Sequence, residues 1–435
     1  MTQAEQIKRL KQQLKEARTA TNAAERDRDG ALKKLRRAAE AAKKDCAKLN
    51  DNARQIMYLE RQQRALVALS NGYGLLGTDH DTMWSHVSEL DRIIETPKLL
   101  KRIAGCTPGQ FAFKLKYFEP LAMEYGPLFR GDGLRASNRG NRCKLYPRHV
   151  LLLALIRYYT GMSESSLQPW FGVDQSGVSR YLGMAADILE RIVVSPEFLT
   201  GLLSMAESVD DITELVPHLR LLVDGTHILR CRPGDGTQRK ASYSGKKKQF
   251  TYNVQVITNC ASLILNISEA VDGSTHDYAL FKKHLDGAGA WLLELAKTCS
   301  AEEKKIKITS DLGYQGIEKD YPQFDHEQGT KRLRKDNPKY EPKHGGLSEA
   351  QVKRNKEVSR IRIPVEWAMG DMKRYRILRG PYVGTAQDLG RDMNIIAGLS
   401  NINELWDHKN DRPGPLLAKL IPKIEARLAS GMPPP

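Results

Sequence analysis

The sequence predicts an α/β fold in its second half, with helical segments ahead of it. From residue 217 three apolar stretches follow one another, HLRLLVDGTHILR, QFTYNVQVITN and SLILNISEAV, and each has the composition of a β-strand. GSTHDYALFKKHLDGAGAWLLELAKTC then starts with helix-capping residues and continues as a helix, and KKIKITSDLGYQGI supplies a fourth strand at 306–309. An excursion and a long helix come last. In such folds functional side chains gather where strands end.

Composition indicates a large soluble protein with an anionic partner. The chain has 435 residues, of which 40% are hydrophobic, and this suffices for two or three domains. Lys and Arg number 68 against 52 Asp and Glu, a net charge of +16 that favours nucleic acid and fits a ribosome-associated protein equally well. The sequence contains neither a long apolar run nor an apolar block at its start, so we expect a cytoplasmic protein without membrane contact. The six cysteines are scattered and predict no zinc site or disulfide framework.

Residues 1–70 predict a basic helical arm. No proline occurs from Ile7 to Leu69, and a seven-residue register can be written. Its seam is apolar at both ends and thin in the middle, where Arg28 and Asp45 fall on it; the apolar members are Ile7, Leu10, Leu14, Leu49, Ile56 and Leu59. A coiled coil that forms a homodimer is one interpretation, and a solvated helix or a contact with DNA phosphates is the other.

Residues 71–145 contain several prolines and end in RGDGLRASNRGNR, which predicts a short helical region and a basic linker.

Residues 146–200 then predict a helix-turn-helix. An apolar helix ends at Gly161, a short helix capped by Ser163 ends at Gly172, and a third helix is capped by Asp174 or Ser176. The third helix would present polar side chains to a DNA groove, namely Gln175, Ser176, Ser179 and Arg180. Three-helix packing without DNA remains the alternative.

Three carboxylates in the α/β region point to metal-dependent chemistry. Asp224 is expected to end the first strand, Asp311 follows the fourth, and Glu366 lies in the first turn of the late helix within RIPVEWAMGDMKRY. Singly, each is an ordinary turn or helix-start residue. Together they would repel one another unless divalent cations balance them. Two ions about 4 Å apart can activate a water or a 3′ hydroxyl at a phosphodiester. Mg²⁺ is the expected metal and Mn²⁺ the substitute.

Several blocks in this region resemble those of a known family. VDGTH at 223–227, YSGKKKQFTYNVQVITN at 243–259, GSTHD at 273–277, SDLGYQG at 310–316 and NKEVSRIRIPVEWAMGDMKRYRIL at 355–378 are similar to the DDE-type transposases of the IS5 kind and the Harbinger-like nucleases. The resemblance covers about residues 145–400. It implies a ribonuclease H-like mixed sheet flanked by helices, with Asp224, Asp311 and Glu366 binding two metal ions.

The resemblance also implies roles for the residues around Glu366. Related transposases carry Tyr, Arg, Glu and Lys at fixed spacing, and here Arg362, Glu366 and Lys373 keep that spacing while Ser359 stands at the Tyr position. Arg362 and Lys373 are therefore expected to contact DNA, although Lys373 on a solvated helix face is the alternative.

Further clusters fit a DNA partner. They are Lys246, Lys247 and Lys248 ahead of the second strand, and KRLRK at 331–335. His276 and Asp277 would either cap a helix or support the carboxylate site as its outer residues, and His227 is expected to pack or contact substrate rather than bind metal.

The implied function is that of a DNA transposase that cuts transposon ends and joins the 3′ hydroxyl to target DNA. A nuclease of the same fold without strand transfer and a non-catalytic DNA-binding protein are the alternatives. Such a protein would be associated with the nucleoid, or nuclear in a eukaryote. The expected organisation is a coiled-coil arm (1–70), a helical and linker region (71–145), a helix-turn-helix (146–200), a catalytic domain (215–405) and a C-terminal tail (406–435).

Overall fold

The computed structural model describes residues 80–125, 145–193, 216–301, 304–332 and 346–429. Nearly all of the described residues belong to one compact unit, His86–Pro435. The predicted coiled coil at 1–70 and most of the basic linker that ends at residue 145 lie outside the described residues. Within the described residues, no helix combines the length and apolarity that a membrane span requires.

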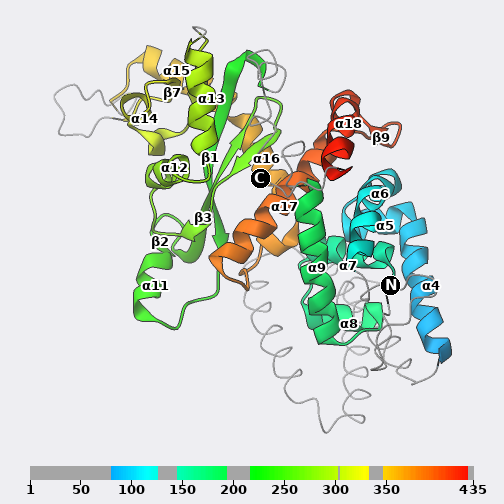
Figure 1. Ribbon diagram of the computed structural model, residues 1–435. Coiled ribbons are helices and arrows are strands. Elements are labelled where there is room, and N and C mark those ends of the chain that lie inside the picture. Colours follow the sequence, from blue (N-terminus) through cyan, green and yellow to red (C-terminus); the bar gives the residue numbers. More distant parts are fainter. Residues whose placement is uncertain (1–79, 126–144, 194–215, 302–303, 333–345, 430–435) are drawn as a thin grey trace, which may run out of the picture. The chain divides into compact units, whose positions relative to one another are not determined.

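The chain ahead of the sheet is helical (Figure 1). Its elements are α4 (His80–Glu95), α5 (Pro97–Ala104), α6 (Pro108–Glu124), α7 (Pro147–Thr160), α8 (Glu164–Phe171) and α9 (Gln175–Val193). Helix α7 is apolar on all sides, and its residues 150–156 are all buried. Helices α5, α6 and α9 pack against α7, which is therefore the centre of this layer.

Helices α7, α8 and α9 lie where the helix-turn-helix is predicted, and their ends follow the expected signals. Gly161 and Gly172 follow α7 and α8 with φ of 66° and 61°, a backbone conformation that glycine adopts without strain. Ser163 accepts a hydrogen bond from the Ser166 N–H at the start of α8. Asp174 rather than Ser176 caps α9, because its Oδ1 accepts from the Gly177 N–H at 3.2 Å.

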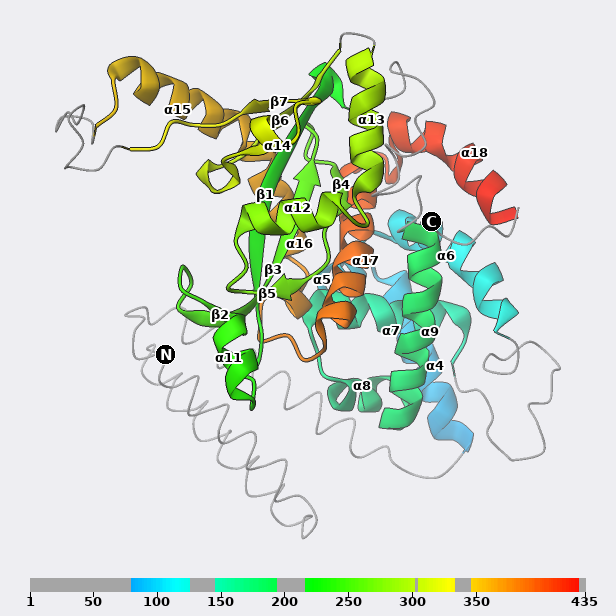
Figure 2. The same cartoon turned by 60° about the vertical axis from the view of Figure 1, so that its left-hand side comes forward.

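The second half of the chain forms a mixed sheet flanked by helices (Figures 1 and 2). Strand β1 (Arg220–Leu229) pairs antiparallel with β3 (Gln249–Thr258) and parallel with β6 (Ile306–Thr309), which in turn pairs parallel with β7 (Phe324–Glu327). The short strands β2 (Tyr243–Ser244), β4 (Ile264–Ile267) and β5 (Val271–Asp272) all pair with β3. This mixed arrangement fits the ribonuclease H-like domain implied by the motifs.

Helices cover both faces of strand β3. Every residue of β3 from Thr251 to Thr258 is buried, whereas a strand with one solvated face would alternate. Helix α12 (Asp277–Leu285) and helix α16 (Ile363–Met372) pack on β3, α13 (Ala290–Ala301) packs on β6, and α17 (Ala386–Glu404) packs on β4. The remaining elements are α11 (Gly236–Ser242), α14 (Ile317–Asp320), α15 (Glu349–Ile361), α18 (Pro415–Ala429), and the small strands β8 (Trp406–Asp407) and β9 (Arg412–Pro413).

Helix α17 connects the helical layer to the sheet. Its Asn401 side chain donates to the Ile264 carbonyl at 2.7 Å and accepts from the Ile264 N–H at 2.9 Å, as a neighbouring strand would. On the other side Arg391 pairs with Asp187 and Glu190 of α9. The helical layer and the sheet therefore belong to one compact unit.

The structure corrects three expectations about the strands. Strand β1 does not end at Asp224 but runs on to Leu229, because β3 pairs with it along that whole length. The third predicted strand is divided into β4 and β5, which pair with different parts of β3. The excursion after Asp311 contains a further strand, β7, which the charged sequence FDHE gave no reason to expect.

One buried histidine makes the fold sensitive to acid. Both ring nitrogens of His284 on α12 are buried without a hydrogen-bond partner in the described structure, and burial lowers the pKa of this imidazole to about 4. Between pH 6.5 and 4 the His284 imidazole binds a proton in the unfolded chain but stays neutral in the folded protein. Acidification through this window therefore lowers the free energy of unfolding.

We predict that His284→Leu reduces this pH dependence. Across the window from pH 6.5 to 4, the wild-type protein should lose about 3 kcal/mol more unfolding free energy than the variant. Urea unfolding at several pH values measures the difference. His408→Leu, at an exposed site, is the control for the change in composition. Parallel stability profiles for the wild type and His284→Leu would contradict the prediction.

Candidate functional site

The pairing of β1 with β6 brings Asp224 and Asp311 to corresponding positions. The two strands run parallel, with Leu222 opposite Thr309, and each aspartate lies two residues further along its chain. Strand β6 ends at Thr309, while β1 continues. Each carboxylate accepts a hydrogen bond from a following glycine N–H at 2.8 Å, Asp224 from Gly225 and Asp311 from Gly313. These local bonds orient the two side chains.

A third carboxylate, Asp277, lies between these two. It is the first residue of α12, and its Oδ1 accepts a hydrogen bond from the Asn253 amide at 2.9 Å. A methyl group at Gly225 would lie 2.7 Å from the Asp277 Oδ1, and one at Gly313 would lie 3.3 Å from its Oδ2. The two glycines that follow Asp224 and Asp311 in sequence therefore both border Asp277.

The three carboxylates influence one another and a buried tyrosine. Burial raises the pKa of Asp224, and the charges of Asp311 and Asp277 raise it further, while the Arg362 guanidinium opposes them. Burial likewise raises the pKa of Tyr314 far above its usual value, and the same three carboxylates add to the effect. The Tyr314 hydroxyl is buried and has no hydrogen-bond partner in the described structure.

Arg362 ties the late helices to this site. It stands at the junction of α15 and α16, and its Nη2 lies 2.7 Å from the Asp224 Oδ2 in a pair that is more than four-fifths buried. Helix α16 packs on β1 and β3. Glu366 follows Arg362 by four residues and therefore lies about one helical turn beyond the Arg362–Asp224 pair. Glu366 itself is exposed and forms no hydrogen bond or ion pair with another described residue. The geometry therefore brings Asp224, Asp277 and Asp311 together, with Glu366 on the adjoining helix.

Lys373 and an exposed lysine turn carry positive charge in this part of the protein. Lys373 follows the last residue of α16, and burial together with the charge of Lys247 lowers the pKa of its ammonium group, while Asp224 raises it. Lys246, Lys247 and Lys248 occupy the exposed turn between β2 and β3. His227 on β1 hydrogen-bonds the Thr251 hydroxyl at 3.0 Å through Nδ1; burial is the main cause that lowers its pKa.

The remaining residues that the sequence singled out make no described contact with the three carboxylates. The α9 residues Gln175, Ser176, Ser179 and Arg180 are all exposed and form one face at the start of that helix. His276 precedes α12 but its side chain makes no capping hydrogen bond. Of KRLRK, Lys331 and Arg332 are exposed, and the other three residues lie outside the described part of the chain.

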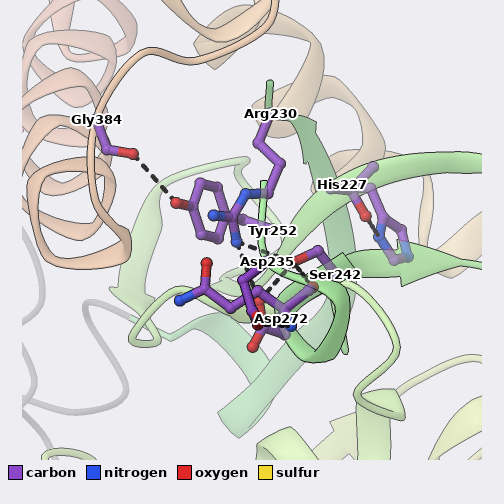
Figure 3. A network of polar contacts seen from close by, with 9 residues as sticks. His227, Arg230, Asp235, Ser242, Tyr252, Asp272 and Gly384 are labelled. Carbon is purple, nitrogen blue, oxygen red and sulfur yellow. Dashed lines mark hydrogen bonds and ion pairs between the residues drawn. The ribbon is translucent and has the colours of Figure 1, made fainter. Parts of the chain in front are cut away.

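Sequence reasoning missed a polar network at the far end of β1 (Figure 3). The Arg230 guanidinium lies over the Tyr252 ring, 4.3 Å from its centroid, and donates to Asp272 at 3.1 Å. The Tyr252 hydroxyl donates to the Gly384 carbonyl at 3.1 Å. These contacts fix the end of the strand that carries Asp224, and they join residues too far apart in sequence for any local pattern to indicate them.

The donor set suits a hard divalent cation. Among the described residues no three His, Cys, Asp or Glu side chains are spaced to hold a metal ion as they stand, and the Arg362 guanidinium pairs with an Asp224 oxygen. The Asp277 and Asp311 carboxylates nevertheless both lie against Gly313, and the buried Tyr314 hydroxyl, whose pKa these carboxylates raise, lacks a partner in the described structure. Oxygen-rich surroundings of this kind fit Mg²⁺ or Mn²⁺ rather than a softer metal.

Comparison with known proteins agrees with this geometry. Residues 223–401 match the family model of the DDE superfamily endonucleases. The chain is also 30% identical over 164 residues to the "Probable transposase for insertion sequence element IS702" of Microchaete diplosiphon, covering 38% of this chain and 50% of that protein. The chain thus spans about half the length of this curated relative, and no solved structure matches it significantly. The segment 223–401 is thus similar to the DDE superfamily endonucleases, which confirms the resemblance to DDE-type transposases inferred from its motifs.

Proposed function

We propose that this protein is a DNA transposase that hydrolyses phosphodiester bonds at transposon ends and joins the freed 3′ hydroxyl to target DNA. One observation carries the proposal: Asp224 on β1 and Asp311 just beyond β6 each follow the paired residues Leu222 and Thr309 by two positions, inside the segment that matches the DDE endonucleases. The relative named as a probable transposase supports the cellular role.

In this proposal Asp224, Asp311 and Glu366 hold two Mg²⁺ ions. Bound divalent ions supply the activation of an attacking oxygen and the neutralisation of a leaving oxygen. Arg362 balances the charge of Asp224 in the structure, and its guanidinium could contact the DNA backbone if bound ions supplied that positive charge instead. Glu366 is suited to complete the ligand set because its side chain is exposed and engaged by no described residue.

The basic residues would guide the DNA. Lys373, which interacts electrostatically with Asp224 and Lys247, would bind backbone phosphates together with the exposed lysine turn at 246–248, and so would Lys331 and Arg332. The exposed face at the start of α9 would read the transposon ends in a DNA groove. His276 and Asp277 would support the site from the start of α12. These assignments divide the chain into an end-recognition part at 146–200 and a catalytic part at 215–405.

A nuclease without strand transfer is the second candidate, because the family model that matches describes endonucleases. Incubation of the protein with a labelled transposon end, Mg²⁺ and a plasmid target distinguishes the two. Joined products support the transposase, and cleaved ends without joined products support the nuclease. DNA binding without either product would leave a non-catalytic DNA-binding protein.

We predict that Asp224→Asn, Asp311→Asn and Glu366→Gln each lower the rate of end cleavage by about a hundredfold or more. Each change removes a charged metal ligand at nearly constant volume, so DNA binding should remain close to that of the wild type. Gel-based cleavage and fluorescence anisotropy measure the two properties. Asp325→Asn, which alters an aspartate on β7 beside Lys307, is the matched control. Near-normal cleavage by one of the three variants would remove that residue from the site.

We predict that Arg180→Ala weakens binding to transposon ends more than binding to random DNA. A base contact is worth about 1–3 kcal/mol of discrimination, whereas a phosphate contact affects all sequences alike. Arg191→Ala is the control, since it makes the same charge change at the opposite end of α9, where Arg191 pairs with Glu124. Equal losses for both DNAs would make Arg180 a phosphate contact only.

We predict that residues 1–70 pair two copies of the chain with modest affinity. The apolar seam is thin, and DNA would strengthen pairing by screening the positive charge of the arm. Deletion of residues 1–70, with the mass measured in solution with and without DNA, tests this. If the truncated chain formed the same oligomer as the full chain in both conditions, pairing would belong to another surface.

A further inference from the structure

We propose that Asp277 binds the divalent ion directly, together with Asp224 and Asp311, and that Asn253 positions it for this role. The inference rests on the proposed metal-dependent reaction. It gives Asp277 a place among the ligands, where the sequence motifs assigned it only a supporting one, and it leaves Glu366 as the ligand that joins from α16.

The Asp277 carboxylate lies against both neighbouring aspartate loops. Its Oδ2 and the Asp311 Oδ1 are both within 3.3 Å of the point where a Cβ at Gly313 would stand. Its Oδ1 is 2.7 Å from the corresponding point at Gly225, the residue that also donates to Asp224. Neither glycine has a positive φ, so the backbone conformation does not require glycine at these positions. The close approach of Asp277 explains why a side chain would not fit there.

A buried amide holds Asp277 in this place. Asn253 is fully buried on β3, and its amide donates to the Asp277 Oδ1 at 2.9 Å and to the Thr275 carbonyl at 3.0 Å. One carboxylate oxygen is thus fixed from the sheet, and the other remains on the side of Asp311. Metal ligands are commonly oriented by such an outer hydrogen bond.

A role at the helix start does not account for these contacts. An acidic residue at the third position of a helix often bonds back to the residue before the helix, as Asp388 of α17 does with the Thr385 N–H at 2.9 Å and the Thr385 hydroxyl at 2.7 Å, whereas Asp277 is the first residue of α12. Within the described structure Asp277 makes no such bond to the chain ahead of α12. Its hydrogen-bond donor comes instead from a neighbouring strand.

The buried hydroxyl of Tyr314, whose pKa these carboxylates raise, has no hydrogen-bond partner in the described structure. This side chain is completely buried, its hydroxyl has no described partner, and the charges of Asp277, Asp224 and Asp311 all act on it. Leaving a buried hydroxyl unpaired costs about 1–3 kcal/mol. A hydrated cation among the carboxylates would bring oxygen atoms that this hydroxyl can bond. The Arg362 guanidinium now balances Asp224, so the ion would take its place.

Metal binding by the full chain without DNA tests the inference. Free Mn²⁺ is measured by electron paramagnetic resonance during titration of the wild type, Asp277→Asn and Asp388→Asn. We expect at least about a tenfold loss of Mn²⁺ affinity for Asp277→Asn. The matched control Asp388→Asn changes a first-turn aspartate outside the site and should bind as the wild type does. Equal affinity of all three proteins would overturn the inference.

A ligand exchange separates direct binding from positioning. Asp277→Cys, Asp224→Cys and Asp388→Cys are titrated with Cd²⁺, which prefers thiolate, and the ultraviolet thiolate-to-metal absorption is compared with that of the wild type. We expect new absorption for the first two variants and none for the third. Absorption for Asp224→Cys alone would exclude Asp277 as a ligand and leave the proposed function standing. Absorption for neither would overturn the metal site itself, and this inference with it.

Discussion

Carboxylates that are crowded at the edge of a buried sheet need positive charge, and the site is arranged around that need. Asp224 is more than four-fifths buried and has Asp277 and Asp311 as neighbours. A charged carboxylate in such surroundings is costly unless a cation is near. In the structure the cation is Arg362, at the point where α15 passes into α16. The ion pair with Asp224 on β1 therefore acts together with the buried apolar side chains of α16 in placing that helix.

The order of the elements in the α/β region could be predicted from sequence, but their pairing could not. Strand β6 occurs where IKIT predicted it, and Glu366 lies in the first turn of a helix as expected. These features depend on local pattern. The predicted end of β1 at Asp224 was wrong. The Asp-Gly pair by itself indicates a turn, but pairing with β3 continues past it to Leu229.

The candidate site divides in the same way. The motifs placed Asp224 and Asp311 near the ends of apolar strands, and the parallel register of β1 and β6 brings them together. The position of Asp277 near Asp224 and Asp311 could be predicted only from the strand pairing. That pairing places Asn253 of β3 opposite His227 of β1, and Asn253 bonds to Asp277 at the start of α12. No pattern within one segment contains that information. The Arg362 contact with Asp224 spans 138 residues and is equally invisible in the chain.

The structure gives the separate motifs one physical explanation. VDGTH, GSTHD and SDLGYQG each contribute an aspartate, and two of them also contribute the glycine that makes room for the third aspartate. An alanine at Gly225 or Gly313 would push against the Asp277 carboxylate, which Asn253 holds in place. The small residues beside Asp224 and Asp311 are therefore part of the same construction as the acidic ones. Neighbouring carboxylates favour a cation between them, and in the structure the Arg362 guanidinium supplies that positive charge at Asp224.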